Sequence, residues 1–161
     1  MSQTTDQLLV YKAHPDAILP IRASAQAAAY DLFALYQVNL NCYDTPVAIE
    51  TGIVVQPPTG YHTELLIRSS MSKKGLILCN GVGLIDRDFS GTKDTIKVLL
   101  RYMPPMIWET GRFGDQRYEP EVLHDFTYII KQGDRIAQLL IRKTHSMDIV
   151  EVEQAPQLVS R

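Results

Sequence analysis

The sequence has little of what several large classes of protein need. No apolar run approaches the ~20 residues of a membrane-spanning helix. The two cysteines, Cys42 and Cys79, are too few for a disulfide framework. The net charge is -2, so the broad basic field that binds nucleic acid polymers is missing. The sequence therefore predicts neither a membrane nor a nucleic acid polymer as a partner.

The composition indicates an ordinary soluble protein. The chain has 161 residues, of which 45% are hydrophobic and 21% charged, which fits a single domain over residues 1–161. The polar stretch Met1–Gln7 lacks the shape of a signal peptide, and two reduced thiols suit the cytosol. We expect a cytoplasmic protein, or one of the host cytoplasm if it is viral. Local basic residues at Arg68, Lys73 and Lys74 favour a small anionic ligand.

Short β-branched segments separated by turn residues predict an all-β fold with little helix, either a barrel or a sandwich. The turns fall at 57–60 and 132–134. The expected strands cover residues 8–11, 47–55 (interrupted by Gly52), 61–67, 96–100, 136–141 and 149–152.

Helical signals are weak. Ala23–Ala29 has helical propensity but is short and leads into the extended-looking Tyr30–Phe33, so we expect no helix there. One or two turns are predicted for Ser69–Lys74, with Ser69 or Ser70 as the N-cap and free amides that favour an anion. Residues 103–125 form a long irregular excursion, typical of a functional or mobile loop or of a surface loop packed on its own base.

The segment Asn80–Gly91 carries the most chemistry. The amide of Asn80 offers a donor and an acceptor to one edge of a base, and the ring of Phe89 can stack on a base or sugar. Asp86 is the candidate general base, provided that water reaches it. The pattern favours a pocket for a flat polar ring. Purely structural roles stay open: a turn carboxylate for Asp86, a turn amide for Asn80 and a core ring for Phe89.

Four segments, in order, resemble the trimeric dUTPase family. They are Ala27–Ala34, Arg68–Gly75, Asn80–Gly91 and Gly133–Leu139. The resemblance implies a jelly-roll-like β-barrel and a homotrimer with active sites between subunits. It also implies Mg2+ and hydrolysis of dUTP to dUMP and pyrophosphate.

The resemblance also implies roles for single residues. Asp86 matches the residue that activates water, and Phe89 stands where the family usually has the tyrosine that packs on deoxyribose. Asp31 matches an aspartate that reaches the metal through water. The positions that match uracil recognition are Asn80, Gly83, Leu84 and Ile85, and those that match phosphate binding are Arg68, Ser69, Ser70, Gln138 and Arg161.

The sequence departs from the family at several points. Ser70 and Ala29 stand where glycine is common. The family's glycine-rich arm does not follow Arg161 in this sequence, and we expect that the sequence is clipped before a flexible tail; closure by other means or weak activity are the alternatives. A non-catalytic nucleotide sensor or protein-binding module on the same fold therefore remains an alternative. The related dCTP deaminases use a glutamate on the strand after the third segment, but residues 95–101 contain no carboxylate.

Overall fold

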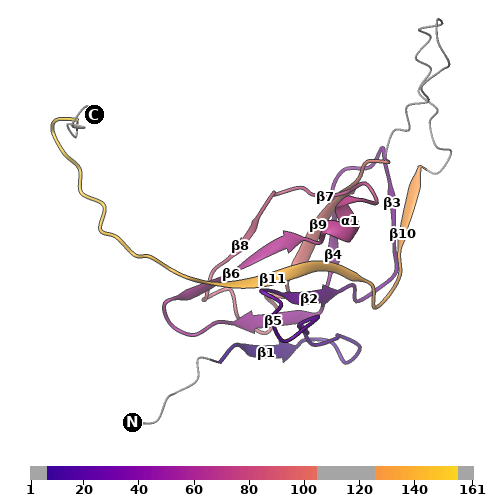
Figure 1. Cartoon of the computed structure of the whole chain (residues 1–161), viewed down its shortest axis with the longest axis horizontal. Helices are drawn as coiled ribbons and strands as arrows, with labels where there is room; N and C mark the ends of the chain where they lie inside the picture. Colours follow the sequence, from indigo (N-terminus) through magenta and orange to yellow (C-terminus); the bar gives the residue numbers. More distant parts are fainter. Residues whose placement is uncertain (1–6, 105–125, 156–161) are drawn as a thin grey trace, which may run out of the picture.

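The structure of the chain, a computed structural model, describes residues 7–104 and 126–155. These residues form short strands and a single one-turn helix (Figure 1), so the all-β prediction is confirmed. The elements are β1 (Leu9–Lys12), β2 (Tyr30–Phe33), β3 (Val38–Asn41), β4 (Val47–Glu50), β5 (Ile53–Gln56), β6 (Tyr61–Ile67), α1 (Ser69–Ser72), β7 (Leu76–Leu78), β8 (Gly83–Ile85), β9 (Lys97–Tyr102), β10 (Thr127–Ile130) and β11 (Arg135–Lys143).

The strands of the described residues belong to four antiparallel sheets. The largest has the order β2-β11-β6-β8, and the others are β4-β9-β7, β1-β5 and β10-β3. Hydrogen bonding within this part of the chain does not close the sheets into one continuous barrel. The largest sheet matters most for function, because β11 carries Gln138 and the end of β6 leads directly into Arg68 and α1.

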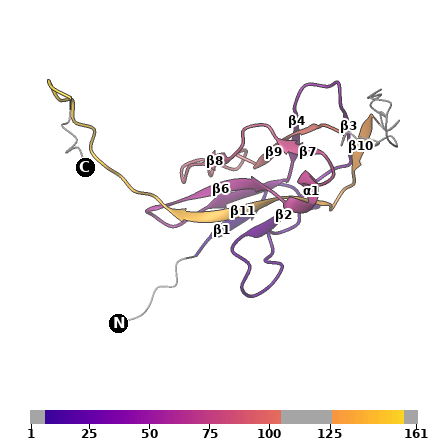
Figure 2. The ribbon, with the colours of Figure 1, turned by 45° about the horizontal axis from the view of Figure 1, so that its top comes forward.

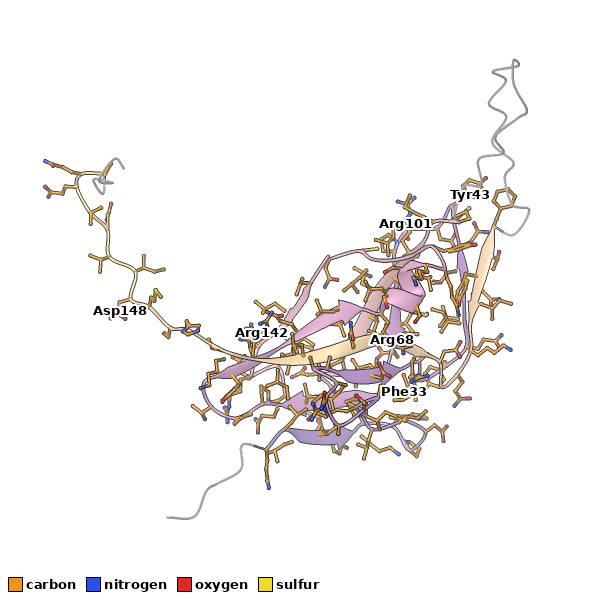
Figure 3. All side chains as sticks on the ribbon, viewed as in Figure 1. Phe33, Tyr43, Arg68, Arg101, Arg142 and Asp148 are labelled. Atoms are coloured by element: carbon orange, nitrogen blue, oxygen red, sulfur yellow. The ribbon has the colours of Figure 1, made fainter. Side chains whose placement is uncertain are left out.

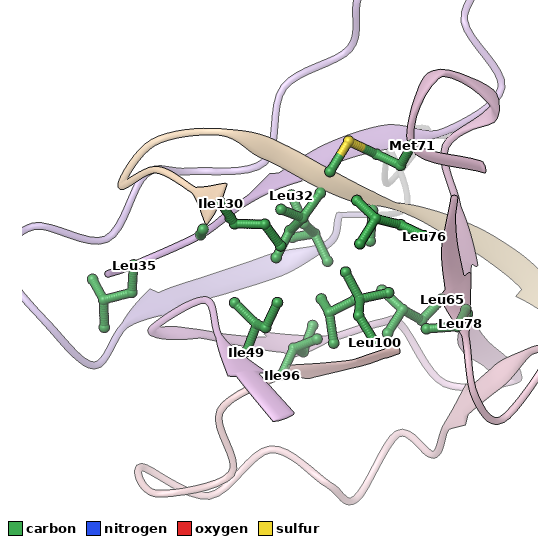
Figure 4. Packing of buried hydrophobic residues seen from close by; sticks show 14 of the residues in the cluster. Leu32, Leu35, Ile49, Leu65, Met71, Leu76, Leu78, Ile96, Leu100 and Ile130 are labelled. Atoms are coloured by element: carbon green, nitrogen blue, oxygen red, sulfur yellow. The ribbon is translucent and has the colours of Figure 1, made fainter. Parts of the chain in front are cut away.

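Alternating side chains of the facing sheets build the core. In β9 the buried residues are Val98, Leu100 and Tyr102, so every second side chain points inward. Leu65 of β6 and Leu100 of β9 are among the packed side chains of Figure 4. Each fully buried leucine contributes about 2–3 kcal/mol through its removal from water. This core fixes β6, β8 and β11, from which the functional residues project.

Several local predictions are confirmed. The segment 47–55 divides into β4 and β5 at Gly52, whose φ is 66°. A Cβ at that residue would lie 3.0 Å from Cβ of Ala17, so only glycine suits the turn. The strand at Tyr61–Ile67 has the predicted bounds, and Ala23–Ala29 is not helical.

The predicted helix after Arg68 exists, but its predicted capping is wrong. The N-cap residue is Arg68, and it makes no side-chain capping hydrogen bond. Ser69 and Ser70 lie inside the single turn and are exposed. The reason is that Arg68 keeps extended backbone angles (φ -79°, ψ 140°), so the first helical residue is already Ser69.

The strand predicted at Ile149–Val152 is wrong. Residues 144–155 leave the body of the molecule after β11 (Figure 1) without forming a strand. Ile149 is fully exposed at 101%, and Val150 is exposed at 75%. Among the described residues this segment pairs with no strand, so its β-branched composition alone does not make it one.

Two further predictions fall largely outside the structure. Of the excursion at 103–125, only Met103 and Pro104 are among the described residues, and Arg161 is not. In the described ranges, no helix has the length and apolar character needed to cross a membrane.

Candidate functional site

A pocket of about 430 Å³ opens beside β8. This volume lies within the range of small-molecule sites. One wall comes from the arm between Asn80 and Phe89, and the other from the return segment Lys93–Lys97. Among the lining residues are all five positions that the sequence suggested for a base or sugar: Asn80, Gly83, Leu84, Ile85 and Phe89.

Gly83 determines how closely the arm lies against the sheet. It pairs with Leu65 of β6, and a Cβ at Gly83 would lie 2.9 Å from Cβ of Leu65. The same Cβ would lie 3.2 Å from Nδ2 of Asn80, so this side-chain amide sits next to the glycine at the pocket wall. The arm can lie this close to β6 only because Gly83 has no side chain.

The ring of Phe89 is 45% exposed, which contradicts the alternative that it is a core residue. Its backbone N–H donates to the carbonyl of Asp86 at 3.2 Å, so a turn joins these two residues. The turn leaves the phenylalanine ring on the pocket wall. Asp86 is exposed and directly follows β8 on the same arm, but it is not among the residues that line the pocket.

The return segment of the pocket was missed from the sequence. Glu50 holds it in place: Thr95 Oγ1 donates to Oε2 of Glu50 at 2.9 Å, and Lys97 Nζ lies 3.0 Å from Oε1. Asp94 accepts a hydrogen bond from the N–H of Gly91 at 2.8 Å, which closes the turn. The turn residues around Gly91 were the only sequence signal for this wall.

A second cluster gathers around the carboxylate of Asp31, whose side chain is only 8% exposed. Arg68 Nε lies 2.9 Å from Asp31 Oδ1, and Arg135 Nη1 lies 3.2 Å from Asp31 Oδ2. Arg68 also donates from Nη1 to the carbonyl of Arg135 at 3.2 Å. Figure 3 shows Arg68 beside β11.

Gln138 belongs to the same cluster. It lies opposite Asp31 on β2 and opposite Leu66 on β6, and its Nε2 donates to the carbonyl of Ile67 at 3.3 Å. Ser69 and Ser70 follow Arg68 directly in the chain. The structure thus brings Arg68 and Gln138 close to Asp31 and adds Arg135, for which the sequence suggested no role in binding.

The described residues contain no group of three or more His, Cys, Asp or Glu side chains able to hold a metal ion. Both carboxylate oxygens of Asp31 face guanidinium groups. This arrangement does not fit a metal held directly by the protein. It fits only a cation whose main ligands come from a substrate and from water, as Mg2+ accepts.

The pocket beside β8 and the cluster around Asp31 lie at different places along β6 in one chain. Asp86 follows Ile85, which pairs with Thr63, whereas Arg68 follows the last residue of β6. The rise of a strand, about 3.3 Å per residue, puts roughly 16 Å between Thr63 and Arg68. Figure 2 shows β8 beside the early part of β6, with α1 beyond its end. The structure therefore does not bring Asp86 close to Arg68 and Gln138 within a single chain.

Comparison with known sequences gives consistent results. A family model described as dUTPase matches residues 15–101. A deoxyuridine 5'-triphosphate nucleotidohydrolase of Hydrogenobaculum sp. (strain Y04AAS1) is 32% identical over 149 residues, which cover 92% of this chain and 88% of that protein. One from Leptospira interrogans is 34% identical over 151 residues, covering 88% of this chain and 83% of the relative.

Solved structures share the fold. The dUTPase of Staphylococcus bacteriophage 80alpha with dUpNHpp has a TM-score of 0.76 and 25% identity, with 96% of this chain and 93% of that chain covered. A mutant dUTPase of phage phi11 of S. aureus, described as revealing the coordination of a structural Mg(II) ion, has a TM-score of 0.72 and 25% identity. Its comparison covers 94% of this chain and 100% of the other.

Proposed function

The chain belongs to the dUTPase family, and on that premise we propose that it is a dUTP diphosphatase, which hydrolyses dUTP to dUMP and pyrophosphate. The observation that carries the proposal is the arm Asn80–Phe89. It lines a pocket of about 430 Å³ and carries the exposed Asp86 directly after β8. A base pocket and a general base on one arm suit hydrolysis at a nucleotide's first phosphate.

The pocket would recognise uracil by hydrogen bonds and by shape. Asn80 and the backbone around Gly83, Leu84 and Ile85 line it. A fixed donor suits the uracil carbonyl and rejects the amino group of cytosine, because a buried donor would be left unpaired. A close wall rejects the extra methyl group of thymine.

Phe89 would pack on the deoxyribose and exclude a ribose 2'-hydroxyl. We expect Phe89→Ala to lower the preference for dUTP over UTP, measured as the ratio of kcat/KM values, by about tenfold. The matched control is Val82→Ala, which removes an exposed apolar side chain outside the pocket lining. An unchanged ratio in Phe89→Ala would show that the ring does not select the sugar.

The cluster around Arg68 would bind the phosphates. A guanidinium group pairs with phosphate oxygens through parallel hydrogen bonds, and the hydroxyl groups of Ser69 and Ser70 add donors. Gln138 would contact phosphate or metal-bound water. Arg161 would contribute from the C-terminal end of the chain.

Asp86 would act as the general base. It removes a proton from a water molecule whose oxygen attacks the α-phosphorus, and the bond from that phosphorus to the pyrophosphate oxygen breaks. The pyrophosphate leaves with the electron pair of that bond, and Asp86 is left protonated until it exchanges with solvent. The role of this chain is to position the water, the base and the phosphates.

Mg2+ is the proposed cofactor. When bound, it would neutralise charge on the triphosphate, with the phosphate oxygens and water as its main ligands. Asp31 would reach it only through water, since its own oxygens pair with arginines.

A homotrimer with sites between subunits would bring the pocket arm of one subunit, with Asp86, close to the Asp31 cluster of its neighbour, with Arg68. The separation of Asp86 from Arg68 along β6 supports this, because a single chain leaves both half-sites incomplete. The adjacent exposed side chains of Ile149 and Val150 also support an assembly, since neighbouring exposed apolar side chains often mark a surface that another protein chain covers. We expect light scattering to give three times the monomer mass. A monomer that hydrolyses dUTP would contradict shared sites.

The function itself is tested by incubating the protein with dUTP, dCTP and dTTP in the presence of Mg2+. We expect pyrophosphate from dUTP alone. Release of ammonia from dCTP would instead identify a deaminase. Binding of dUTP without any turnover would identify the non-catalytic sensor that the sequence left open.

A further inference from the structure

Strand β11 contains an irregularity at the phosphate cluster. Arg135 lies opposite Phe33 of β2, but the next pair joins Ala137 to Leu32, so β11 has one extra residue. That residue, Ile136, is fully buried in the core. Such a β-bulge redirects a neighbouring side chain.

The redirected side chain is that of Arg135. Strict alternation would put Arg135 on the same face as the buried Ala137 and Leu139. With the extra residue, the guanidinium group instead reaches Asp31, which lies opposite Gln138. The bulge thus keeps the apolar side chains in the core and adds a second arginine to Asp31.

The three charged residues form a closed set of contacts. Arg135 Nη1 lies 3.2 Å from one oxygen of Asp31, and Arg68 Nε lies 2.9 Å from the other. Arg68 Nη1 donates to the backbone carbonyl of Arg135 at 3.2 Å. Arg135 therefore contacts Asp31 with its side chain and Arg68 with its main chain.

This arrangement restricts the orientation of Arg68. Among the described residues, Arg68 uses Nε toward Asp31 and Nη1 toward the Arg135 carbonyl, which leaves Nη2 to donate to a phosphate. A buried carboxylate held by hydrogen bonds on both oxygens is a more rigid support than one held on a single oxygen. Two guanidinium groups around one carboxylate also leave a net positive charge, which suits a triphosphate.

We infer that Arg135 is a positioning residue for nucleotide binding: it fixes Asp31 and thereby holds Arg68 in the orientation that binds phosphate. The inference rests on the proposed function, because it assumes a nucleotide triphosphate as the ligand. It assigns no contact between Arg135 and the nucleotide, and this separates it from a second phosphate-binding arginine.

The test is a double-mutant cycle on the affinity for dUpNHpp, measured by calorimetry with the full chain and Mg2+. We expect Arg135→Ala alone to weaken binding by about tenfold, a loss that lies within the range of coupling measured between contacting residues. In an Arg68→Ala background, the same change should weaken binding less than about twofold, since the residue through which it acts is gone.

A matched control lies on the same strand. Arg142 of β11 also pairs with a carboxylate, with Nε 3.2 Å from Oε2 of Glu64, and its side chain is 58% exposed against 47% for Arg135. Figure 3 shows Arg142 well away from Arg68. Arg142→Ala should leave the dUpNHpp affinity unchanged. An equal loss in this control would mean that removing any positive charge from β11 suffices, and would overturn the inference.

Arg135→Lys keeps the positive charge, and its dUpNHpp affinity is measured instead if the alanine variant does not fold. It should restore part of the affinity, because a single ammonium group reaches Asp31 without the geometry of guanidinium. Losses that simply add in the Arg135/Arg68 double variant would show direct phosphate binding by Arg135 and overturn the inference. A wild-type chain that does not bind dUpNHpp would refute the proposed function together with it.

Discussion

Replacement of Asp86 by asparagine should lower the kcat for dUTP by about 10²–10⁴-fold, the usual contribution of a general base. The affinity for dUpNHpp should stay close to that of the wild type. The reason is that asparagine has nearly the shape of aspartate but cannot take a proton from water. Asp86 is exposed and does not line the pocket, so its neutralisation leaves the pocket intact.

Steady-state kinetics and calorimetry check this result. The control is Asp88→Asn, which removes an exposed carboxylate two residues further along the same arm. It should leave kcat within a few-fold of wild type. Near-normal turnover in Asp86→Asn would contradict the mechanism, and equal losses in both variants would point to a general effect of charge.

Gly83→Ala should both destabilise the chain and weaken nucleotide binding. The new Cβ would lie 2.9 Å from Cβ of Leu65, an atom that cannot move without its backbone. Strand β8 must therefore shift away from β6, and overpacking of this kind costs about 1–3 kcal/mol in the free energy of unfolding. Because β8 forms the pocket wall, we expect the dUpNHpp affinity to fall more than about tenfold, as for a misfitted pocket.

Thermal unfolding and calorimetry separate the two effects. The control is Gly60→Ala in the turn between β5 and β6, where φ is 82° and a Cβ would meet nothing within 4 Å. That change should lower stability through backbone strain and leave nucleotide affinity intact. If Gly83→Ala binds dUpNHpp as tightly as the wild type, the arm does not form the base pocket.

The strands that were predicted correctly have strong local signals. Tyr61–Ile67 follows the turn residues at 57–60 and ends in the apolar run Leu65–Ile67, and Gly52 and Gly133 mark turns through their positive φ angles. The missed strands β3, β7, β8 and β10 have only three or four residues each, which is too few for an alternation to be recognised. Ile149–Val152 has the composition of a strand, but pairing depends on an edge that composition does not encode.

The candidate site was predictable in its parts but not in its arrangement. Asn80 and Phe89 came from the chemistry of a single segment, and both line the pocket. Glu50 and Arg135 were not recognised as parts of the site, because their contacts depend on strand pairing across the sheet and on a β-bulge. No local pattern marks such contacts. The separation of Asp86 from Arg68 follows from the register of β6, which sequence alone does not determine.

The most direct measurement is a crystal structure of the protein with dUpNHpp and Mg2+. The proposed mechanism predicts one water molecule between the carboxylate of Asp86 and the α-phosphorus, in line with the leaving pyrophosphate. It further predicts that Asp86 comes from one subunit and Arg68 from a neighbouring one. A structure in which the Asp86 side chain points away from that phosphorus, with no solvent between them, would contradict it.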